Sequence, residues 1–340
     1  MLIESEATLE ERLSQPWPVT IKTLGEYDGD ILILGIGGKM GPSLARLIQR
    51  ADAELGQRRR LIGVSRFSNS TLRHQLEIEG IQTIAANALD TAQVQALPDS
   101  EIVIHMTGMK FGTATNPGLT WATNTLGPSK ICERYPQSRI LAFSTGNVYP
   151  LVPSHSKGCP EDTPLEASGE YANAAIGRER IFDYYSRENR TAISLLRLNY
   201  AVEPRYGVLH DIGKMVWNNE VINLAMGLVN VIWQGDANNL ALCALSDASS
   251  PAQPINIAGA EIISVKSIAD QFAHHFGKPP RFLGEEAPTA LLNDGRAAHR
   301  RYAAPRVAVA DVIHWTADWI ASGKRSFNKP THFQTRDGKF

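Results

Sequence analysis

Short apolar runs alternate with segments of helical periodicity along the first 200 residues of the chain. The run at residues 30–35 is continuously apolar between its ends, as is typical of a parallel strand covered on both faces. Strand and helix patterns then follow each other at intervals of a few tens of residues. This alternation predicts an α/β fold, a Rossmann-type doubly wound parallel sheet. Strands are expected at 60–65, 82–85, 101–105, 139–144 and 191–196, the last closing the sheet, and helices at 38–53, 71–79, 91–96, 118–135 and 169–189.

The pattern changes on both sides of this region. Residues 1–29 predict a leader extension with one amphipathic helix at 8–13, followed by a proline-containing segment. Beyond the dinucleotide-binding domain at 30–200, residues 201–322 predict a smaller mixed C-terminal substrate lobe, with helices at 212–218, 265–276 and 309–321. Alternatively, the chain returns to the Rossmann sheet near residues 231–240. Residues 323–340 carry many charges without clear periodicity and predict an extended tail.

Composition removes several classes of function. The 34 Lys and Arg residues nearly balance the 35 Asp and Glu residues, so no global field favours nucleic acid or an acidic membrane surface. No apolar stretch approaches the roughly 20 residues that span a bilayer, and the acidic start is unlike a signal peptide. The three cysteines are far apart in sequence, and nothing has the spacing of metal ligands. We therefore expect a cytoplasmic protein without a metal, a membrane or a nucleic-acid partner.

A glycine-rich loop directly follows the first strand and precedes a helix. It reads Gly35-Ile-Gly37-Gly38-Lys39-Met40-Gly41. Gly35 permits a tight turn, the missing side chains let the backbone approach a diphosphate, and Gly41 permits close packing of the helix on the sheet. The diphosphate then lies at the helix N-terminus, where unpaired amides and the helix dipole favour an anion. The loop predicts a dinucleotide site.

The end of the second strand bears on the choice of cofactor. NAD-binding Rossmann domains usually carry a carboxylate there, which holds the ribose 2′-hydroxyl. Here Ser65 stands at that place and Arg66 follows. A guanidinium binds a 2′-phosphate that a carboxylate would repel. The sequence thus favours NADP over NAD, and the alternative is that Arg66 is only a solvated loop charge.

With these motifs the sequence resembles the NAD-dependent epimerase/dehydratase family, the extended short-chain dehydrogenase/reductases. The resemblance runs from about residue 30 to 240, more weakly to 320, and implies hydride transfer between nicotinamide and a sugar-like substrate. It implies that Thr145, in Phe143-Ser144-Thr145-Gly-Asn-Val-Tyr149, and Tyr171 are catalytic. It also implies a homodimer built through helices 118–135 and 169–189. Further cofactor contacts are expected at Asn87 and Ala88 beside the adenine, at Met106, Thr107 and Gly108 after the fourth strand, and at Asn124.

One departure from the family pattern concerns catalysis. The family has Tyr-x-x-x-Lys, but this chain has Tyr171-Ala-Asn-Ala-Ala175. A free phenol has a pKa of about 10, and a neighbouring lysine favours its phenolate and holds the nicotinamide ribose. Arg178 follows Tyr171 on nearly the same helix face but about 10 Å along the axis, and Lys157 lies in the preceding loop. The sequence leaves two functions open: an NAD(P)-dependent oxidoreductase or epimerase of sugars, and a catalytically impaired cofactor-binding sensor or partner module.

Overall fold

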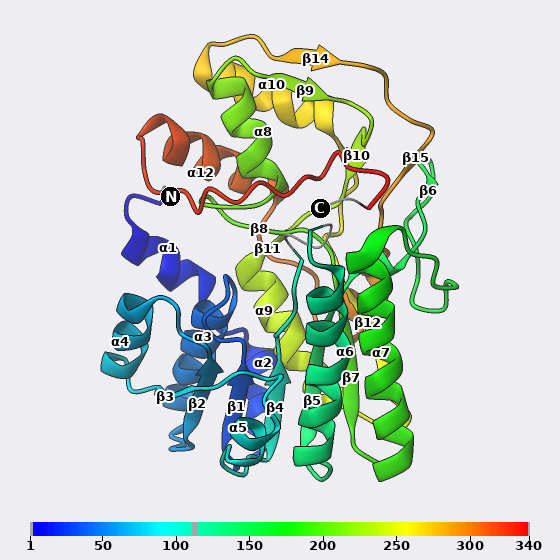
Figure 1. Ribbon diagram of the computed structural model, residues 1–340. Coiled ribbons are helices and arrows are strands. Elements are labelled where there is room, and N and C mark those ends of the chain that lie inside the picture. The colour runs from blue at the N-terminus through cyan, green and yellow to red at the C-terminus, as the bar shows by residue number, and fades with distance from the viewer. Residues whose placement is uncertain (1–2, 111–114, 339–340) are drawn as a thin grey trace.

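A seven-stranded parallel sheet forms the lower half of the computed structural model in Figure 1, which describes residues 3–110 and 115–338. The first two residues of the predicted leader and the last two of the predicted tail lie outside these ranges. The strand order is β3-β2-β1-β4-β5-β7-β12, and every neighbouring pair is parallel. The predicted doubly wound fold is confirmed. The strands are β1 (Ile31–Leu34), β2 (Leu61–Ser65), β3 (Gln82–Ala85), β4 (Ile102–His105), β5 (Arg139–Thr145), β7 (Ile193–Leu198) and β12 (Gln253–Ile257).

Side chains of β1 alternate between two hydrophobic layers, as a strand covered on both faces requires. Ile31 and Ile33 pack in the layer that contains helix α3, whereas Leu32 and Leu34 pack in the layer that contains α6 and α7. The chain order reverses between β1 and β4, which opens a crevice at the carboxyl ends of these strands. The flanking helices are α3 (Gly41–Leu55), α4 (Ser70–Ile78), α5 (Thr91–Gln95), α6 (Pro117–Arg134) and α7 (Gly169–Asn189).

The chain returns to the sheet twice after β7. Helix α9 (Gln234–Cys243) is buried along its whole length and packs against α3 and α2 (Pro18–Leu24), and β12 then adds a strand beside β7. The prediction that residues 191–196 close the sheet is therefore wrong. β12 alternates polar and apolar residues and contains Pro254, which an edge strand tolerates, so its short sequence does not resemble the buried central strands. Helix α2 was also missed, although Pro18 at its first position is a typical start.

Three helices pack together above the sheet in Figure 1 and, with several two-stranded ribbons, form what we call the C-terminal lobe. Its apolar centre includes Ile212, Phe272 and Ile313. The helices are α8 (Val208–Trp217), α10 (Val265–Phe276) and α12 (Val309–Ala321), and the short helix α11 (Arg296–Arg301) contacts β12 instead. The ribbons pair β8 (Ala201–Val202) with β11 (Ile232–Trp233), β9 (Val221–Asn223) with β14 (Arg281–Leu283), β10 (Leu228–Val229) with β13 (Ile263–Ser264), and β6 (Val152–Pro153) with β15 (Thr289–Ala290).

The C-terminal segment, residues 323–338, crosses between the sheet and the C-terminal lobe without forming a helix or strand. Specific contacts hold it there. The Thr331 amide and hydroxyl both donate to the Asp211 carboxylate, at 2.7 and 2.6 Å. Arg336 donates to the carbonyl oxygens of Ala225 and Thr289, at 2.9 and 2.7 Å. Phe333 is buried in the C-terminal lobe, so the predicted tail is a docked part of the fold.

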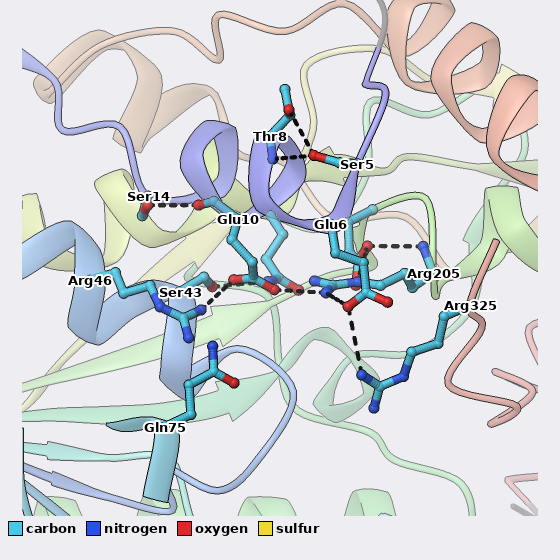
Figure 2. Close-up of polar contacts among 12 residues, drawn as sticks. Ser5, Glu6, Thr8, Glu10, Ser14, Ser43, Arg46, Gln75, Arg205 and Arg325 are labelled. Carbon is cyan, nitrogen blue, oxygen red and sulfur yellow. Dashed lines mark hydrogen bonds and ion pairs between the residues drawn. The ribbon is translucent and has the colours of Figure 1, made fainter. Parts of the chain in front are cut away.

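Helix α1 (Glu6–Leu13) forms ion pairs with α3, with Arg205 and with the C-terminal segment (Figure 2). Glu10 accepts from Arg46 of α3 at 2.5 Å and from the buried Arg205 at 2.7 Å. Glu6 lies 3.6 Å from both Arg205 and Arg325, the latter in the C-terminal segment. Within the described ranges, no helix is both long and apolar enough to cross a membrane.

Candidate functional site

The glycine-rich loop between β1 and α3 has a shape that only glycine permits. Gly35 has a φ of +87°, and a Cβ there would lie 3.0 Å from the Met106 and Thr107 backbone. A Cβ on Gly37 would lie 2.7 Å from the Ser65 hydroxyl, and one on Gly41 would lie 2.4 Å from the Ile36 carbonyl oxygen. The loop is thus held closely between the ends of β2 and β4.

Helix α3 begins directly after this loop, with Gly41 as its first residue and Pro42, which has no N–H, as its second. Its N-cap, Met40, makes no side-chain capping bond, and its first turn holds no acidic residue. Gly37 and Gly38 are exposed. Unpaired amides at a helix N-terminus bind phosphate through hydrogen bonds and the helix dipole. The residues present therefore fit the diphosphate of a dinucleotide.

The residues predicted to bind the adenosine half lie at the carboxyl ends of β2 and β3. Ser65 faces Gly37, and Arg66 is exposed immediately after β2. Asn87 is exposed, and its side-chain oxygen accepts the Leu89 amide at 3.1 Å. Ala88 lies near Gly127 of α6. These positions share the sheet edge with the glycine loop, and their contacts with a cofactor stay a prediction.

One cavity of about 140 Å³ brings the two predicted catalytic residues to the glycine loop. Thr145 ends β5, and its hydroxyl donates to the Asn147 side-chain oxygen at 3.1 Å. Tyr171 is the third residue of α7 and is buried. Lys39 and Met40 of the loop line the same space. The other lining residues are Lys110, Ser144, Asn147, Leu198, Tyr200, Ala201, Tyr206, Gly207, Val208 and Thr331.

Lys39 extends from the loop toward the residues that follow β7. Its ammonium lies 3.3 Å from the centroid of the Tyr206 ring and 3.5 Å from the Ala201 carbonyl oxygen. Burial lowers the pKa of Lys39 to about 7, although the Glu203 carboxylate opposes this shift. Burial likewise lowers the pKa of Lys110 to about 8, against the opposing effect of Asp211. Sequence reasoning assigned Lys39 to the cofactor and missed Lys110 and Thr331.

Ala175, which stands where the family has its lysine, is packed among apolar side chains. Ala175 is fully buried in a small cluster with Val148, Tyr149 and Cys159. A lysine side chain introduced there would enter this apolar cluster, so an Ala175→Lys variant changes the packing as well as the charge.

Arg178 occupies a different place from that lysine. Its guanidinium donates to the Phe143 carbonyl oxygen at 2.6 Å and to the side-chain oxygen of Asn124. It is buried beside Gly108, where a Cβ would lie 2.8 Å from it. Burial lowers the pKa of Arg178, and the nearby Tyr171 opposes this shift. Arg178 is therefore a buried cation behind the cavity and is not one of the lining residues.

Asn124 and His105 are buried and contact other parts of the protein. The Asn124 amide donates to the carbonyl oxygens of Thr120 and Met109, at 2.8 and 3.3 Å, which holds the segment after β4. His105 is buried, and burial together with the Arg178 charge lowers its pKa to about 3, so the ring is neutral. Across the part of the chain that the structure describes, no three His, Cys, Asp or Glu side chains gather in a way that would hold a metal ion.

Comparison with known proteins identifies the family. A profile of the NAD dependent epimerase/dehydratase family matches residues 31–238, more than half of the chain. The chain belongs to the NAD dependent epimerase/dehydratase family. A search of curated protein sequences finds no match.

Solved members of this type share the fold. UDP-glucose 4-epimerase of Thermus thermophilus is 17% identical, with a TM-score of 0.70 over 85% of this chain and 98% of that chain. UDP-glucuronic acid 4-epimerase of Bacillus cereus is 18% identical, with a TM-score of 0.71 over 87% and 100%. The dTDP-glucose 4,6-dehydratase DesIV of Streptomyces venezuelae is 15% identical, with a TM-score of 0.73 over 86% and 97%. At these identities the likeness shows the fold of the epimerase/dehydratase family alone.

Proposed function

We propose that this protein is an NAD(P)-dependent oxidoreductase or epimerase that acts on a sugar derivative by hydride transfer. The observation that carries the proposal is the single cavity in which Thr145 and Tyr171 meet Lys39 and Met40 of the glycine loop. A cofactor whose diphosphate lies at the N-terminus of α3 has its nicotinamide end within reach of this cavity. The sugar nucleotides named with the solved structures support the substrate class, since UDP-glucuronic acid 4-epimerase was crystallised with UDP-glucuronic acid and NAD.

The two catalytic side chains have distinct tasks. A bound nicotinamide would supply the acceptor or donor of the hydride at the substrate carbinol. The Thr145 hydroxyl hydrogen-bonds the substrate oxygen, and the Tyr171 phenol takes or returns its proton. Two cations lie near Tyr171: Lys39, in the same cavity, and Arg178, buried behind it.

The direct test incubates cofactor-loaded protein with a panel of sugar nucleotides and follows both nicotinamide absorbance at 340 nm and the products by chromatography, because an epimerase returns the hydride and leaves no net change in absorbance. Tyr171→Phe removes the proton carrier, and we expect activity to fall about 100-fold or more. Tyr184→Phe is the matched control, because this tyrosine lies on the same helix with 56% of its surface exposed. The alternative function, a cofactor-binding module without catalysis, rests on Ala175. Cofactor binding without turnover of any panel member, unchanged by Tyr171→Phe, would establish that alternative.

For the cofactor we propose a preference for NADP over NAD. Arg66 is exposed at the end of β2, and the segment from Ser65 to Ser70 contains no carboxylate. Arg66→Ala removes a charge-assisted contact of about 1.5–3 kcal/mol with a 2′-phosphate, so the Kd of NADP should rise about 10-fold to 150-fold. The Kd of NAD, the cofactor named with the solved structures, should not change. An equal effect on both cofactors refutes this assignment.

We also propose that the protein is a homodimer built through α6 and α7, which pack against each other. Large apolar side chains are exposed on these two helices, as a dimer face requires. They are Leu119, Trp121, Leu126 and Tyr184, with 40–56% of each exposed. Leu126→Glu should convert the dimer to a monomer in sedimentation velocity, whereas Ile78→Glu on α4, also exposed, should leave it a dimer.

A further inference from the structure

The Tyr171 cavity is smaller than the substrate class proposed above requires. Its volume is about 140 Å³, whereas sites that enclose drug-sized ligands usually measure about 300–1,000 Å³. A sugar nucleotide, which carries a base, two sugar rings and a diphosphate, belongs to that range. The cavity must therefore widen before such a molecule can bind with its sugar at Tyr171, and one of the walls must move.

Much of the cavity wall belongs to the sheet and its helices. Thr145 ends β5, Leu198 ends β7, and Tyr171 is in the first turn of α7. Thr331 is different, because it belongs to the C-terminal segment, which forms neither a helix nor a strand. This part of the wall can move without breaking the hydrogen bonds of the sheet or of a helix.

The same segment also forms a wall of a second cavity, which has a volume of about 270 Å³. Thr335, Arg336 and Gly338 line this second cavity. Asn147 and Tyr200 line both cavities, so the two spaces are neighbours. If the C-terminal segment moved away, the two small cavities would become one opening of the size that a sugar nucleotide needs.

The C-terminal segment is docked on both sides of this opening. On the side of the C-terminal lobe, the Phe333 ring is buried in the apolar centre. On the side of the sheet, Gly338 packs against the start of α7, where a Cβ on Gly338 would collide with the Ser168 carbonyl oxygen. The segment therefore extends from the C-terminal lobe to the helix that carries Tyr171 (Figure 1).

We propose that the C-terminal segment is a lid over the Tyr171 site, which must detach before a sugar nucleotide can bind. This inference rests on the proposed function and adds how entry to the same site is controlled. The docked lid competes with the substrate for space, so the observed Kd equals the intrinsic Kd divided by the fraction of molecules with the lid detached. A change that weakens only the docking of the lid should therefore tighten the binding of the substrate.

Calorimetric binding of UDP-glucose and UDP-glucuronic acid to cofactor-loaded protein tests this competition. Phe333→Ala removes a buried anchor of the lid that lines neither cavity. We expect the Kd of the sugar nucleotide to fall about fivefold or more. Phe276→Ala is the matched control, because Phe276 packs against the same apolar centre from α10 and is not part of the lid. Its Kd should stay within about twofold of the unaltered protein.

Hydrogen exchange of the unaltered protein gives a second readout, which needs no substitution. In the docked lid, the Phe327 amide donates to the Arg205 carbonyl oxygen at 3.1 Å, and the Thr331 amide donates to the Asp211 carboxylate at 2.7 Å. Saturation with the sugar nucleotide should break these bonds and speed exchange in residues 326–338 about 10-fold or more. Exchange in α12, which precedes the lid, should not change.

The outcomes separate this inference from the proposed function. A Kd that rises or stays unchanged in Phe333→Ala overturns the inference, and so does ligand binding that leaves exchange in residues 326–338 unchanged or slows it. Binding of neither nucleotide, even by Phe333→Ala, also overturns it, because a detached lid then admits no substrate. If Phe333→Ala does not fold, the exchange of the unaltered protein decides. Tyr171-dependent turnover without detachment refutes only the lid, whereas detachment without turnover refutes only the proposed function.

Discussion

The Glu179–Arg197 pair joins helix α7, which carries Tyr171, to strand β7, and its removal is the sharpest test of how the candidate site is held. Glu179 belongs to α7, as Tyr171 does, and Arg197 belongs to β7. The guanidinium donates to both carboxylate oxygens, with the shortest bond 2.8 Å. Ser144, next to Thr145, donates to the same carboxylate at 2.5 Å. Both charged side chains are at most 6% exposed.

The balance of effects at Arg197 favours its charged form. Burial opposes the charge of Arg197, but the hydrogen bonds and charge of Glu179 outweigh it and raise the pKa of the guanidinium. Glu179→Gln therefore leaves a buried cation without its counter-charge, which destabilises a protein by about 3–5 kcal/mol. With an unfolding entropy of about 2.1 cal/mol/K per residue, a chain of this length loses about 4–7 °C in Tm.

Differential scanning calorimetry at pH 7.5 measures this loss. Glu188→Gln is the matched control, because Glu188 is exposed on the same helix, and we expect its effect on stability within about 0.5 kcal/mol. The double variant Glu179→Gln/Arg197→Met should be less destabilised than the sum of the single variants, since it removes the stranded charge. A Tm loss for Glu179→Gln equal to that of Glu188→Gln would refute this reasoning.

Three further predictions concern the rest of the molecule. Burial raises the pKa of Asp236 to about 6, against the Val307 and Arg306 amides that it accepts. An acid with a raised native pKa is penalised only where it is ionised, so Asp236→Asn should stabilise by about 1–3 kcal/mol above pH 6 and have no effect below about pH 4. Denaturant titrations at several pH values check this, and a gain that persists at pH 4 contradicts it. Gly41→Ala, whose Cβ would lie 2.4 Å from a backbone oxygen, should weaken cofactor binding at least tenfold by calorimetry, whereas Gly118→Ala, in open space, should not. Thr331→Val removes a 2.6 Å hydrogen bond to the Asp211 carboxylate, worth about 1.5–3 kcal/mol. This loss should speed tryptic cleavage in the C-terminal segment. An unchanged cleavage rate would contradict this prediction.

Local patterns were enough to predict six of the seven strands of the sheet and the glycine loop. The strand β1 and the glycine loop after it are each marked by a few consecutive residues, so both can be recognised in the sequence alone. β12 and α9 are different, because their places depend on β7 and on α2 and α3, which are far away in the chain. The predicted helix at 212–218 begins four residues earlier in the structure, at Val208.

In the candidate site, too, residues in local motifs were predicted, whereas contacts between residues far apart in the sequence were not. Thr145 and Tyr171 were found from motifs with fixed spacing. The direction of the Lys39 side chain depends on Tyr206, a partner more than 160 residues away, and the loop sequence does not contain it. Thr331 reaches the cavity from a segment without periodicity, where no pattern marks a residue as buried. The departure at Ala175 was visible in the sequence, but the apolar cluster that surrounds it was not.

Because Thr331 forms part of the cavity wall, the C-terminal segment closes one side of the site. Arg325 and the stretch from Asn328 to Pro330 are exposed, so a protease reaches the chain between the C-terminal lobe and the docked segment. After such a cut, Thr331 and Arg336 would hold a short peptide by hydrogen bonds and the burial of Phe333. Dissociation of that peptide would expose the cavity to water and leave both the sheet and the helices above it intact.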